Sequence, residues 1–171
     1  MIDRRPLAVI RCMNASDVVR GITVARRHYL PLSVRGGGHS VAGNAVVDGA
    51  VMLDLSGMKA FTLDSESKTV KAEPGLTLGE FDSATQAFGL ATTLGAVSMT
   101  GIAGLTLGGG LGWLNGCYGL TCDNLISADI ATADGQLLRA SERENEDVRP
   151  GRQYKMFRWA WGAWNTCCEW A

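Results

Sequence analysis

The chain has 171 residues and balances 16 Lys and Arg against 17 Asp and Glu, which gives a net charge of −1. Without a basic surface, neither nucleic acid nor an anionic membrane is expected as a partner, and no apolar run is long enough to predict a transmembrane helix. The length allows one domain or part of a longer protein. The five cysteines show no metal-ligand spacing, and their odd number without a signal segment predicts reduced thiols and a cytoplasmic location.

The beginning of the chain follows a strand, helix, strand order. Residues 7–12 form a short apolar run that is typical of a strand. Asn14 can cap the helix that follows over residues 15–27, in which apolar residues recur at helical spacing. Residues 31–34 are the second predicted strand. In α/β units, ligands bind at the carboxyl ends of strands, so the segment after residue 34 is a candidate site.

Short strands dominate the middle of the chain. A helix is predicted over residues 77–88, where Gly89 ends it. A hairpin is predicted within residues 127–140. The remaining strands are expected at residues 50–55, 60–63 and 69–73. Together these segments predict an α+β fold that is rich in strands.

Three consecutive glycines, Gly36, Gly37 and Gly38, follow the second strand and precede His39, one of two histidines. Glycine loses more backbone entropy on folding than other residues, so the run predicts positive φ angles or a close approach to the main chain. A lone histidine is usually a surface or core residue. In this position it could instead attack an electrophilic cofactor, because neutral imidazole is a good nucleophile. No serine–histidine–carboxylate or metal-ligand spacing accompanies it.

A second glycine cluster, LGAVSMTGIAGLTLGGGLGW, occupies residues 94–113. Its backbone N–H groups, with the hydroxyls of Ser98, Thr100 and Thr106, could bind a pyrophosphate. The alternative is a tightly packed loop in which the glycines permit close contact. The chain lacks Gly-Lys-Ser and Gly-Lys-Thr, which excludes a Walker loop. The dinucleotide spacing G-x-G-x-x-G also fails, because Asn115 stands where its third glycine would be.

Three segments together resemble a known family. RGGGHSVAGN (residues 35–44) is similar to the flavin-attachment loop of FAD-linked oxidases of the berberine-bridge-enzyme-like group, in the vanillyl-alcohol oxidase / p-cresol methylhydroxylase superfamily. GIAGLTLGGGLGWL (residues 101–114) resembles the second glycine loop of that group, and YGLTCDNLISA (residues 118–128) continues the match. The resemblance implies an FAD-binding domain of the p-cresol methylhydroxylase type over residues 1–147, with FAD between two α+β subdomains.

The resemblance also implies a role for each glycine loop. His39 would be bonded covalently to the 8α position of the flavin. Some relatives form a second flavin bond through a cysteine, and Val97 stands at that position, which implies a single bond. Residues 35–40 and 98–104 would surround the pyrophosphate and the ring, with residues 108–112 close behind them. The expected cofactor-binding residues are Arg35, Gly36, Gly37, Gly38, His39, Ser40, Gly43, Asn44, Gly95, Ser98, Thr100, Gly101, Gly104, Leu107, Gly108, Gly109, Gly110 and Gly112.

Family members oxidise organic substrates by hydride transfer to the flavin, which implies an oxidoreductase with FAD and a small organic substrate as partners. Relatives usually carry Arg-Lys where this chain has Gly116 and Cys117. Their substrate-binding domain supplies the catalytic base, and nothing here resembles that domain. The segment that usually precedes residue 1 in relatives is also not found, and the FAD-binding domain is expected to be incomplete at both ends. Two alternatives stay open. One is a catalytically inactive truncated fragment or bare flavin-binding module; the other is a strand-rich interaction domain with purely structural glycine loops.

Residues 148–171 differ in composition from the rest. After Val148 there is no Val, Ile or Leu, whereas four of the five tryptophans lie there. Neither helix nor strand periodicity is recognised, so no secondary structure is predicted. Relatives carry a glycine run and Val-Val in this region. Reading one base later would turn the TGG codons of tryptophan into glycine codons and, if Cys167 and Cys168 are coded by TGT, their codons into valine codons. We therefore hypothesise that this tail is out of frame.

Overall fold

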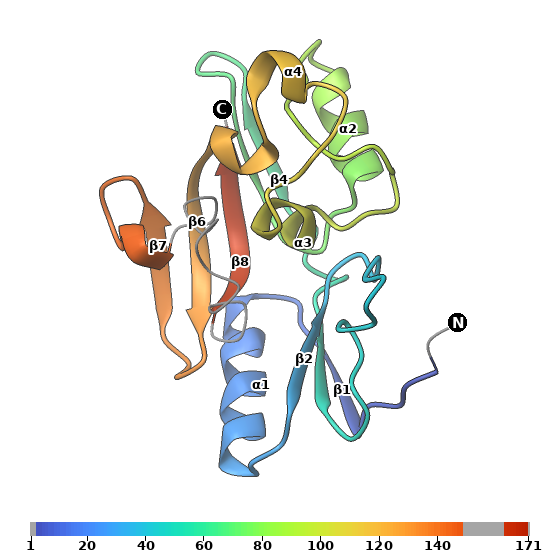
Figure 1. Cartoon of the computed structure of the whole chain (residues 1–171). Coiled ribbons are helices and arrows are strands. Elements are labelled where there is room, and N and C mark those ends of the chain that lie inside the picture. The colour runs from blue at the N-terminus through green and yellow to red at the C-terminus, as the bar shows by residue number, and fades with distance from the viewer. Residues whose placement is uncertain (1–2, 149–162, 171) are drawn as a thin grey trace.

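The computed structural model describes residues 3–148 and the backbone of residues 163–170. The chain forms two lobes, each built on its own sheet (Figure 1). One lobe combines a three-stranded sheet with the longest helix. The other combines a five-stranded sheet with shorter helices. The expected α+β class is confirmed.

The first lobe is a strand–helix–strand unit with one more strand. β1 (Ala8–Arg11), β2 (Leu32–Arg35) and β3 (Val51–Asp54) pair in parallel in the order β1-β3-β2, which leaves β2 at an edge. α1 (Ala15–Arg27) connects β1 to β2 and packs on the sheet (Figure 1). All four elements confirm the predicted segments. The carboxyl end of β2 leads directly into the first glycine loop.

The predicted cap starts α1, because the side-chain oxygen of Asn14 accepts a hydrogen bond from the Asp17 N–H at 3.1 Å. Val18 and Ile22 lie on the face that is buried, each 1% exposed, and pack in one core with Leu53 of β3. Burying an aliphatic side chain of this size stabilises a fold by roughly 1.5–3 kcal/mol. The apolar stripe therefore fixes the helix on the sheet.

The second lobe is built on an antiparallel sheet. Its strands are, in spatial order, β4 (Phe61–Asp64), β5 (Thr69–Ala72), β8 (Ala163–Trp170), β6 (Leu125–Thr132) and β7 (Leu137–Ser141). The predicted strands in the middle of the chain are confirmed as β4 and β5. The predicted hairpin is confirmed as β6 and β7.

Helices of the second lobe lie beside this sheet (Figure 1). α2 (Leu78–Gln86) confirms the predicted helix. α3 (Ile102–Leu107) falls within the glycine cluster and α4 (Asn115–Tyr118) follows it, and no helix was expected at either place. Glycine and threonine have low helix propensity, which hides such short helices from local analysis. Two 3₁₀ helices, η1 (Thr121–Asn124) and η2 (Glu146–Val148), follow.

Aromatic and aliphatic side chains form the core of the second lobe. Phe81 is fully buried and meets Phe61 edge to face, with ring centroids 5.5 Å apart. Ile102 of α3 packs into the same core. Its burial explains why a glycine-rich segment becomes helical, since tertiary packing outweighs a weak local preference.

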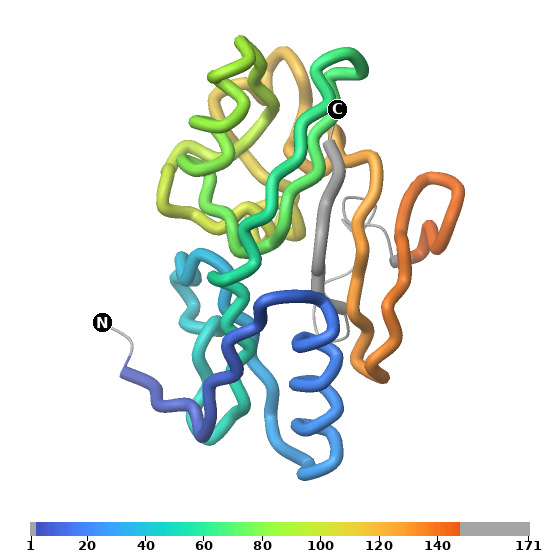
Figure 2. The backbone as a smooth tube through the Cα atoms, turned by 180° about the vertical axis from the view of Figure 1, so that it is seen from behind, coloured from blue at the N-terminus to red at the C-terminus, as the bar shows by residue number. Residues whose placement is uncertain are grey.

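The two lobes lie against each other where α1 runs beside the β6–β7 hairpin (Figure 2). Ala131 of β6 belongs to the core of the first lobe. The Arg26 guanidinium of α1 donates a hydrogen bond to the Asp134 carbonyl at 2.7 Å. The first lobe therefore packs against the β6–β7 hairpin of the second.

Part of the tail forms a strand, although no structure was expected there. β8 pairs antiparallel with both β5 and β6 and lies between them. A strand in this position depends on partners far away in the sequence, which a local pattern does not reveal. Every second residue from Trp164 to Trp170 is Trp, Thr or Cys, and this period of two is the signal that was available. Residues 149–162 and 171 lie outside the described residues.

Candidate functional site

The two glycine loops meet backbone to backbone between the lobes. A Cβ atom on Gly37 would overlap the amide nitrogen of Gly101 and lie 2.7 Å from its Cα. A Cβ atom on Gly101 would in turn overlap the amide nitrogen of Gly37. Neither position can carry a side chain unless the loops move apart. Close approach of the main chain therefore explains these two glycines.

The segment before α2 holds the second loop in place. The N–H of Leu78 donates to the Thr100 carbonyl at 2.9 Å, and the N–H of Ile102 donates to the Leu76 carbonyl at 3.0 Å. Thr77 and Gly101 form an isolated antiparallel bridge between these two bonds. The start of α2 thus sets the position of Gly101 against the first loop.

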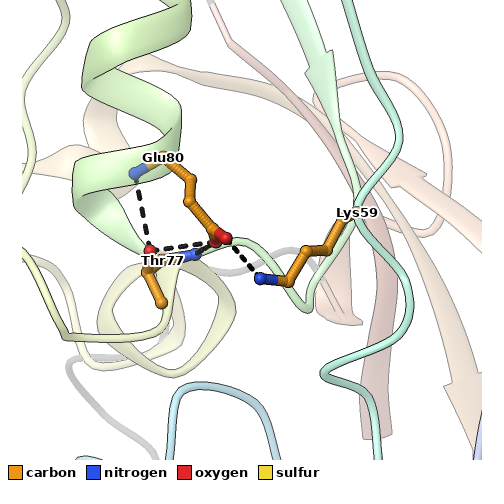
Figure 3. Close-up of polar contacts among 3 residues, drawn as sticks. All are labelled: Lys59, Thr77 and Glu80. Carbon is orange, nitrogen blue, oxygen red and sulfur yellow. Dashed lines mark hydrogen bonds and ion pairs between the residues drawn. The ribbon is translucent and has the colours of Figure 1, made fainter.

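A capping box fixes the start of α2 (Figure 3). The Thr77 hydroxyl oxygen accepts a hydrogen bond from the Glu80 N–H at 3.4 Å, and the Glu80 carboxylate accepts one from the Thr77 N–H at 2.9 Å. The Lys59 ammonium also bonds to this carboxylate. The bond from Lys59, followed by that from Thr77, lowers the pKa of Glu80 below its ordinary value. The carboxylate is therefore charged at neutral pH and serves the cap.

An ion pair at the carboxyl ends of β2 and β3 supports the first loop. Arg35 Nη1 lies 3.1 Å from Asp54 Oδ1. Burial raises the pKa of the Asp54 carboxyl, but hydrogen bonds from Ser56 and the Arg35 guanidinium outweigh it and leave that pKa below its ordinary value. Gly38 has a φ of 72°, and a Cβ there would lie 3.2 Å from Arg35 Nε. The Arg35 side chain therefore spans from Asp54 to the glycine run.

A cavity of about 590 Å³ lies where the loops meet. This size fits the usual range of ligand sites, about 300–1,000 Å³. It brings together nine of the residues that were predicted to bind a cofactor, namely Gly36, Gly37, Gly38, His39, Ser40, Asn44, Thr100, Gly101 and Gly104. A Cβ atom on Gly104 would meet nothing within 4 Å. Both loops therefore contribute to one site.

The backbone of the first loop offers hydrogen-bond donors to this cavity. Within the part of the chain that the structure describes, the N–H groups of residues 36–40 have no acceptor, and neither does that of Gly101. Gly36 and Gly37 are half-buried, whereas Gly38, His39 and Ser40 are exposed, so these unpaired donors are open to a ligand or to solvent. Consecutive donors of this kind suit the oxygen atoms of an anion.

The other nine predicted residues lie outside the cavity lining. The Gly43 carbonyl accepts a hydrogen bond from Arg4, and the Ser98 carbonyl accepts one from the Gly79 N–H. The whole set outside the lining is Arg35, Gly43, Gly95, Ser98, Leu107, Gly108, Gly109, Gly110 and Gly112. Their contact with a cofactor stays a prediction.

The second half of the glycine cluster uses its backbone groups internally. The N–H of Gly109 donates to the Thr106 carbonyl at 3.1 Å, and the N–H of Gly112 donates to Asn115 Oδ1 at 2.6 Å. A Cβ atom on Gly112 would overlap the Leu94 carbonyl oxygen. Close packing of the loop accounts for these contacts.

Sequence reasoning missed part of the cavity wall. The residues concerned are Leu32, Ser33, Val34, Ala45, Val47 and Leu105. Leu32, Ser33 and Val34 lie on β2 shortly before the glycine run. Ligands in α/β units bind at the carboxyl ends of strands, and this tendency could have pointed to these three residues.

Two further observations concern other kinds of site. Within residues 3–148, no three His, Cys, Asp or Glu side chains gather in a way that could hold a metal ion. None of the helices described has both the length and the apolar character needed to cross a bilayer.

A family model described as an FAD binding domain matches residues 6–141. The chain belongs to this family. FAD-linked oxidoreductase pgmH of Aspergillus terreus is 41% identical over 141 residues, which cover 82% of this chain and 28% of the relative. (R)-6-hydroxynicotine oxidase of Paenarthrobacter nicotinovorans is 34% identical over 145 residues, which cover 85% of this chain and 32% of the relative.

Solved structures agree with this membership of the FAD binding domain family. The crystal structure of 6-hydroxy-D-nicotine oxidase from Arthrobacter nicotinovorans matches with a TM-score of 0.88 and 32% identity, over 98% of this chain and 36% of that one. Glucooligosaccharide oxidase from Acremonium strictum, described with a 6-S-cysteinyl, 8α-N1-histidyl FAD, matches with a TM-score of 0.86 and 27% identity, over 99% and 35%. The expected resemblance to berberine-bridge-enzyme-like oxidases is confirmed. The chain spans about a third of the length of these proteins.

Proposed function

We propose that the cavity between the two glycine loops binds FAD. The observation that carries the proposal is the run of unpaired N–H groups at residues 36–40, all of which line a cavity of about 590 Å³ in a chain of the FAD binding domain family. The two phosphates of FAD supply the oxygen atoms that such donors need. The residues present therefore fit the cofactor.

Each side of the cavity has a separate task in this proposal. The first loop donates N–H groups to the pyrophosphate, and the Thr100 hydroxyl is within the same lining. Gly104 leaves room for the cofactor because it has no side chain. Arg35, held by Asp54, keeps the first loop in its shape. FAD itself, when bound, supplies the acceptor for the two electrons and the proton of a hydride.

His39 is the residue proposed to attach the flavin covalently. Its side chain is exposed and lies in the cavity lining, directly after the glycine run. A related oxidase is described with an 8α-N1-histidyl FAD. That oxidase also carries a 6-S-cysteinyl bond, whereas Val97 stands at the corresponding place in this chain. The proposal is a single bond, to the 8α carbon of the flavin.

For the whole protein, the proposal is an oxidoreductase that passes a hydride from a small organic substrate to FAD. The related proteins are named as FAD-linked oxidoreductases and as an oxidase of 6-hydroxynicotine. These names support the class of reaction. The chain described here contributes the cofactor site to that reaction.

Acid precipitation of the purified protein tests the proposal. We expect visible flavin absorbance that stays with the pellet, because a covalent bond survives unfolding. His39→Ala should release all flavin into the supernatant, while His28→Ala, the matched change at the other histidine, should behave like the wild type. A protein that shows no flavin absorbance even after incubation with FAD would disprove cofactor binding. Flavin that stays with the pellet of His39→Ala would disprove only the attachment residue.

A further inference from the structure

One buried hydroxyl on the cavity wall has no partner. Ser33 is 2% exposed, and its Oγ is the only buried side-chain polar atom that lacks a hydrogen bond among the residues that the structure describes. Other buried hydroxyls are paired: Thr106 Oγ1 donates to the Ile102 carbonyl at 2.8 Å, and Ser127 Oγ accepts from Arg139 at 2.9 Å. Unpaired buried hydroxyls are rare, which makes the Ser33 hydroxyl a candidate for a hydrogen bond to a ligand.

The strand around Ser33 also presents free backbone groups. β2 pairs only with β3, and the carbonyls of Pro31 and Arg35 accept hydrogen bonds from β3 and from the residue that follows it. In a parallel pair, alternate residues direct their backbone groups to the same neighbour, so those of Leu32 and Val34 point to the free edge. Both residues line the cavity together with Ser33. This wall therefore offers backbone donors and acceptors beside the Ser33 hydroxyl.

Ser33 lies too far from the glycine run to share its ligand atoms. A strand rises about 3.3 Å per residue, so Ser33 stands about 10 Å from Gly36 along β2. Phosphate oxygens that bind the N–H groups of residues 36–40 are out of reach of the Ser33 hydroxyl. Any partner of Ser33 in the same ligand must belong to a sugar, a ribityl chain or a ring.

We propose that the Ser33 hydroxyl forms a hydrogen bond to the bound dinucleotide, at an oxygen or nitrogen atom beyond the phosphates. This inference rests on the proposed FAD site. Ser33 then acts as a binding residue that recognises the organic part of the cofactor, while the glycine loops recognise its phosphates. The cofactor then supplies the hydrogen-bond partner that the Ser33 hydroxyl lacks.

Ser33→Ala tests the inference, in a His39→Ala background so that binding is reversible. The affinity for FAD is measured by quenching of flavin fluorescence, and the melting temperature is measured without FAD. We expect Ser33→Ala to weaken FAD binding about fivefold to tenfold, the size of one hydrogen bond, without lowering the melting temperature. Ser127→Ala is the matched control, since its hydroxyl already has a partner. It should lower the melting temperature and leave FAD affinity unchanged.

ADP as a second probe identifies the half of the cofactor that is contacted. An equal loss for ADP and FAD places the contact in the adenosine half, and a loss for FAD alone places it in the flavin half; either result supports the inference. Equal FAD affinity in Ser33→Ala and its parent overturns the inference and leaves the FAD site intact. Failure of the parent to bind FAD overturns both.

Discussion

The glycines of the two loops differ in what a side chain at each position would contact. Gly37 and Gly101 let two backbones touch, since a Cβ on either would overlap the other loop. Gly112 allows the same kind of approach to the Leu94 carbonyl. Gly104 is different, because a Cβ there would enter open space beside the cavity. A substitution at a glycine of the last kind can therefore change cofactor binding without disturbing the fold.

Gly104→Val should weaken FAD binding and leave the fold intact. The side chain would project where the structure has no atom within 4 Å, at the wall of the cavity. Overpacking of a site costs roughly 1–3 kcal/mol, so we expect binding about tenfold to hundredfold weaker. Calorimetric titration with FAD measures it.

Gly116→Val is the control for Gly104→Val. Gly116 is also exposed and helical, and a Cβ there meets nothing within 4 Å, but it lies outside the cavity. Equal FAD affinity in the two valine variants would contradict the placement of the cofactor. Gly109→Val is a poorer test, because Gly109 has a φ of 98° and a valine there strains the backbone.

The stability of the protein should depend on Asp54 in acid. The folded state holds the pKa of this carboxyl below its ordinary value of about 3.9. The charged form therefore stabilises the fold above that pH, and the contribution is lost as pH falls from about 3.9 through the lower pKa of the folded state.

Asp54→Asn measures this contribution. Hydrogen bonds to charged groups are worth about 1.5–3 kcal/mol, so the free energy of unfolding of the variant should be lower by that amount at neutral pH. Urea titrations between neutral pH and pH 3 should show the difference from the wild type shrinking below pH ~4. A constant difference across this range would contradict a role for the Asp54 charge.

At the scale of elements, the start of α2 links helix stability to the site. Thr77 caps the helix and also bridges to Gly101 of the second loop. Thr77→Ala should lower the free energy of unfolding by about 1 kcal/mol, because one N–H at the helix start loses its acceptor. Urea unfolding measures the change.

Lys59→Ala provides the comparison for Thr77→Ala. The Lys59 and Glu80 side chains are 44% and 41% exposed, and ion pairs in such positions contribute about 0.2–1 kcal/mol. A larger loss in Lys59→Ala than in Thr77→Ala would show that the ion pair, rather than the capping box, fixes α2.

Elements with a local signal were predictable from the sequence. The periodic spacing around Val18 and Ile22 and the cap at Asn14 predicted α1, and short apolar runs predicted most strands. α3 was not predictable in this way, because Ile102 becomes buried only through contacts with remote residues. The backbone contact between Gly37 and Gly101 could not be predicted from the sequence either, because it depends on the path of the chain between the two lobes.

The composition of β8 does not match its position in the sheet. β8 has the pairing of a central strand, although its sequence lacks Val, Ile and Leu. We propose that the gene is out of frame from about residue 148. Its DNA should then encode a glycine run followed by Val-Val when read one base later. The proposal would be wrong if neither of the two other reading frames encodes these residues.

For the whole molecule, the site arises from the arrangement of two lobes. The first supplies the end of β2 and the glycine run, and the second supplies α3 and the loop before it. Contacts such as the Arg26 bond to the Asp134 carbonyl hold the lobes together. The resemblance of the two loops to a family predicted that both face one cofactor, and the structure explains how they come to share one cavity.

A crystal structure of the protein with FAD would show whether the cofactor occupies the cavity between the glycine loops. We expect density for the dinucleotide there, with phosphate oxygens about 2.7–3.2 Å from the N–H groups of residues 36–40. We also expect contact with Gly101 and Gly104 of the second loop. FAD bound elsewhere, with the N–H groups of residues 36–40 unpaired or facing water alone, would disprove this cofactor site.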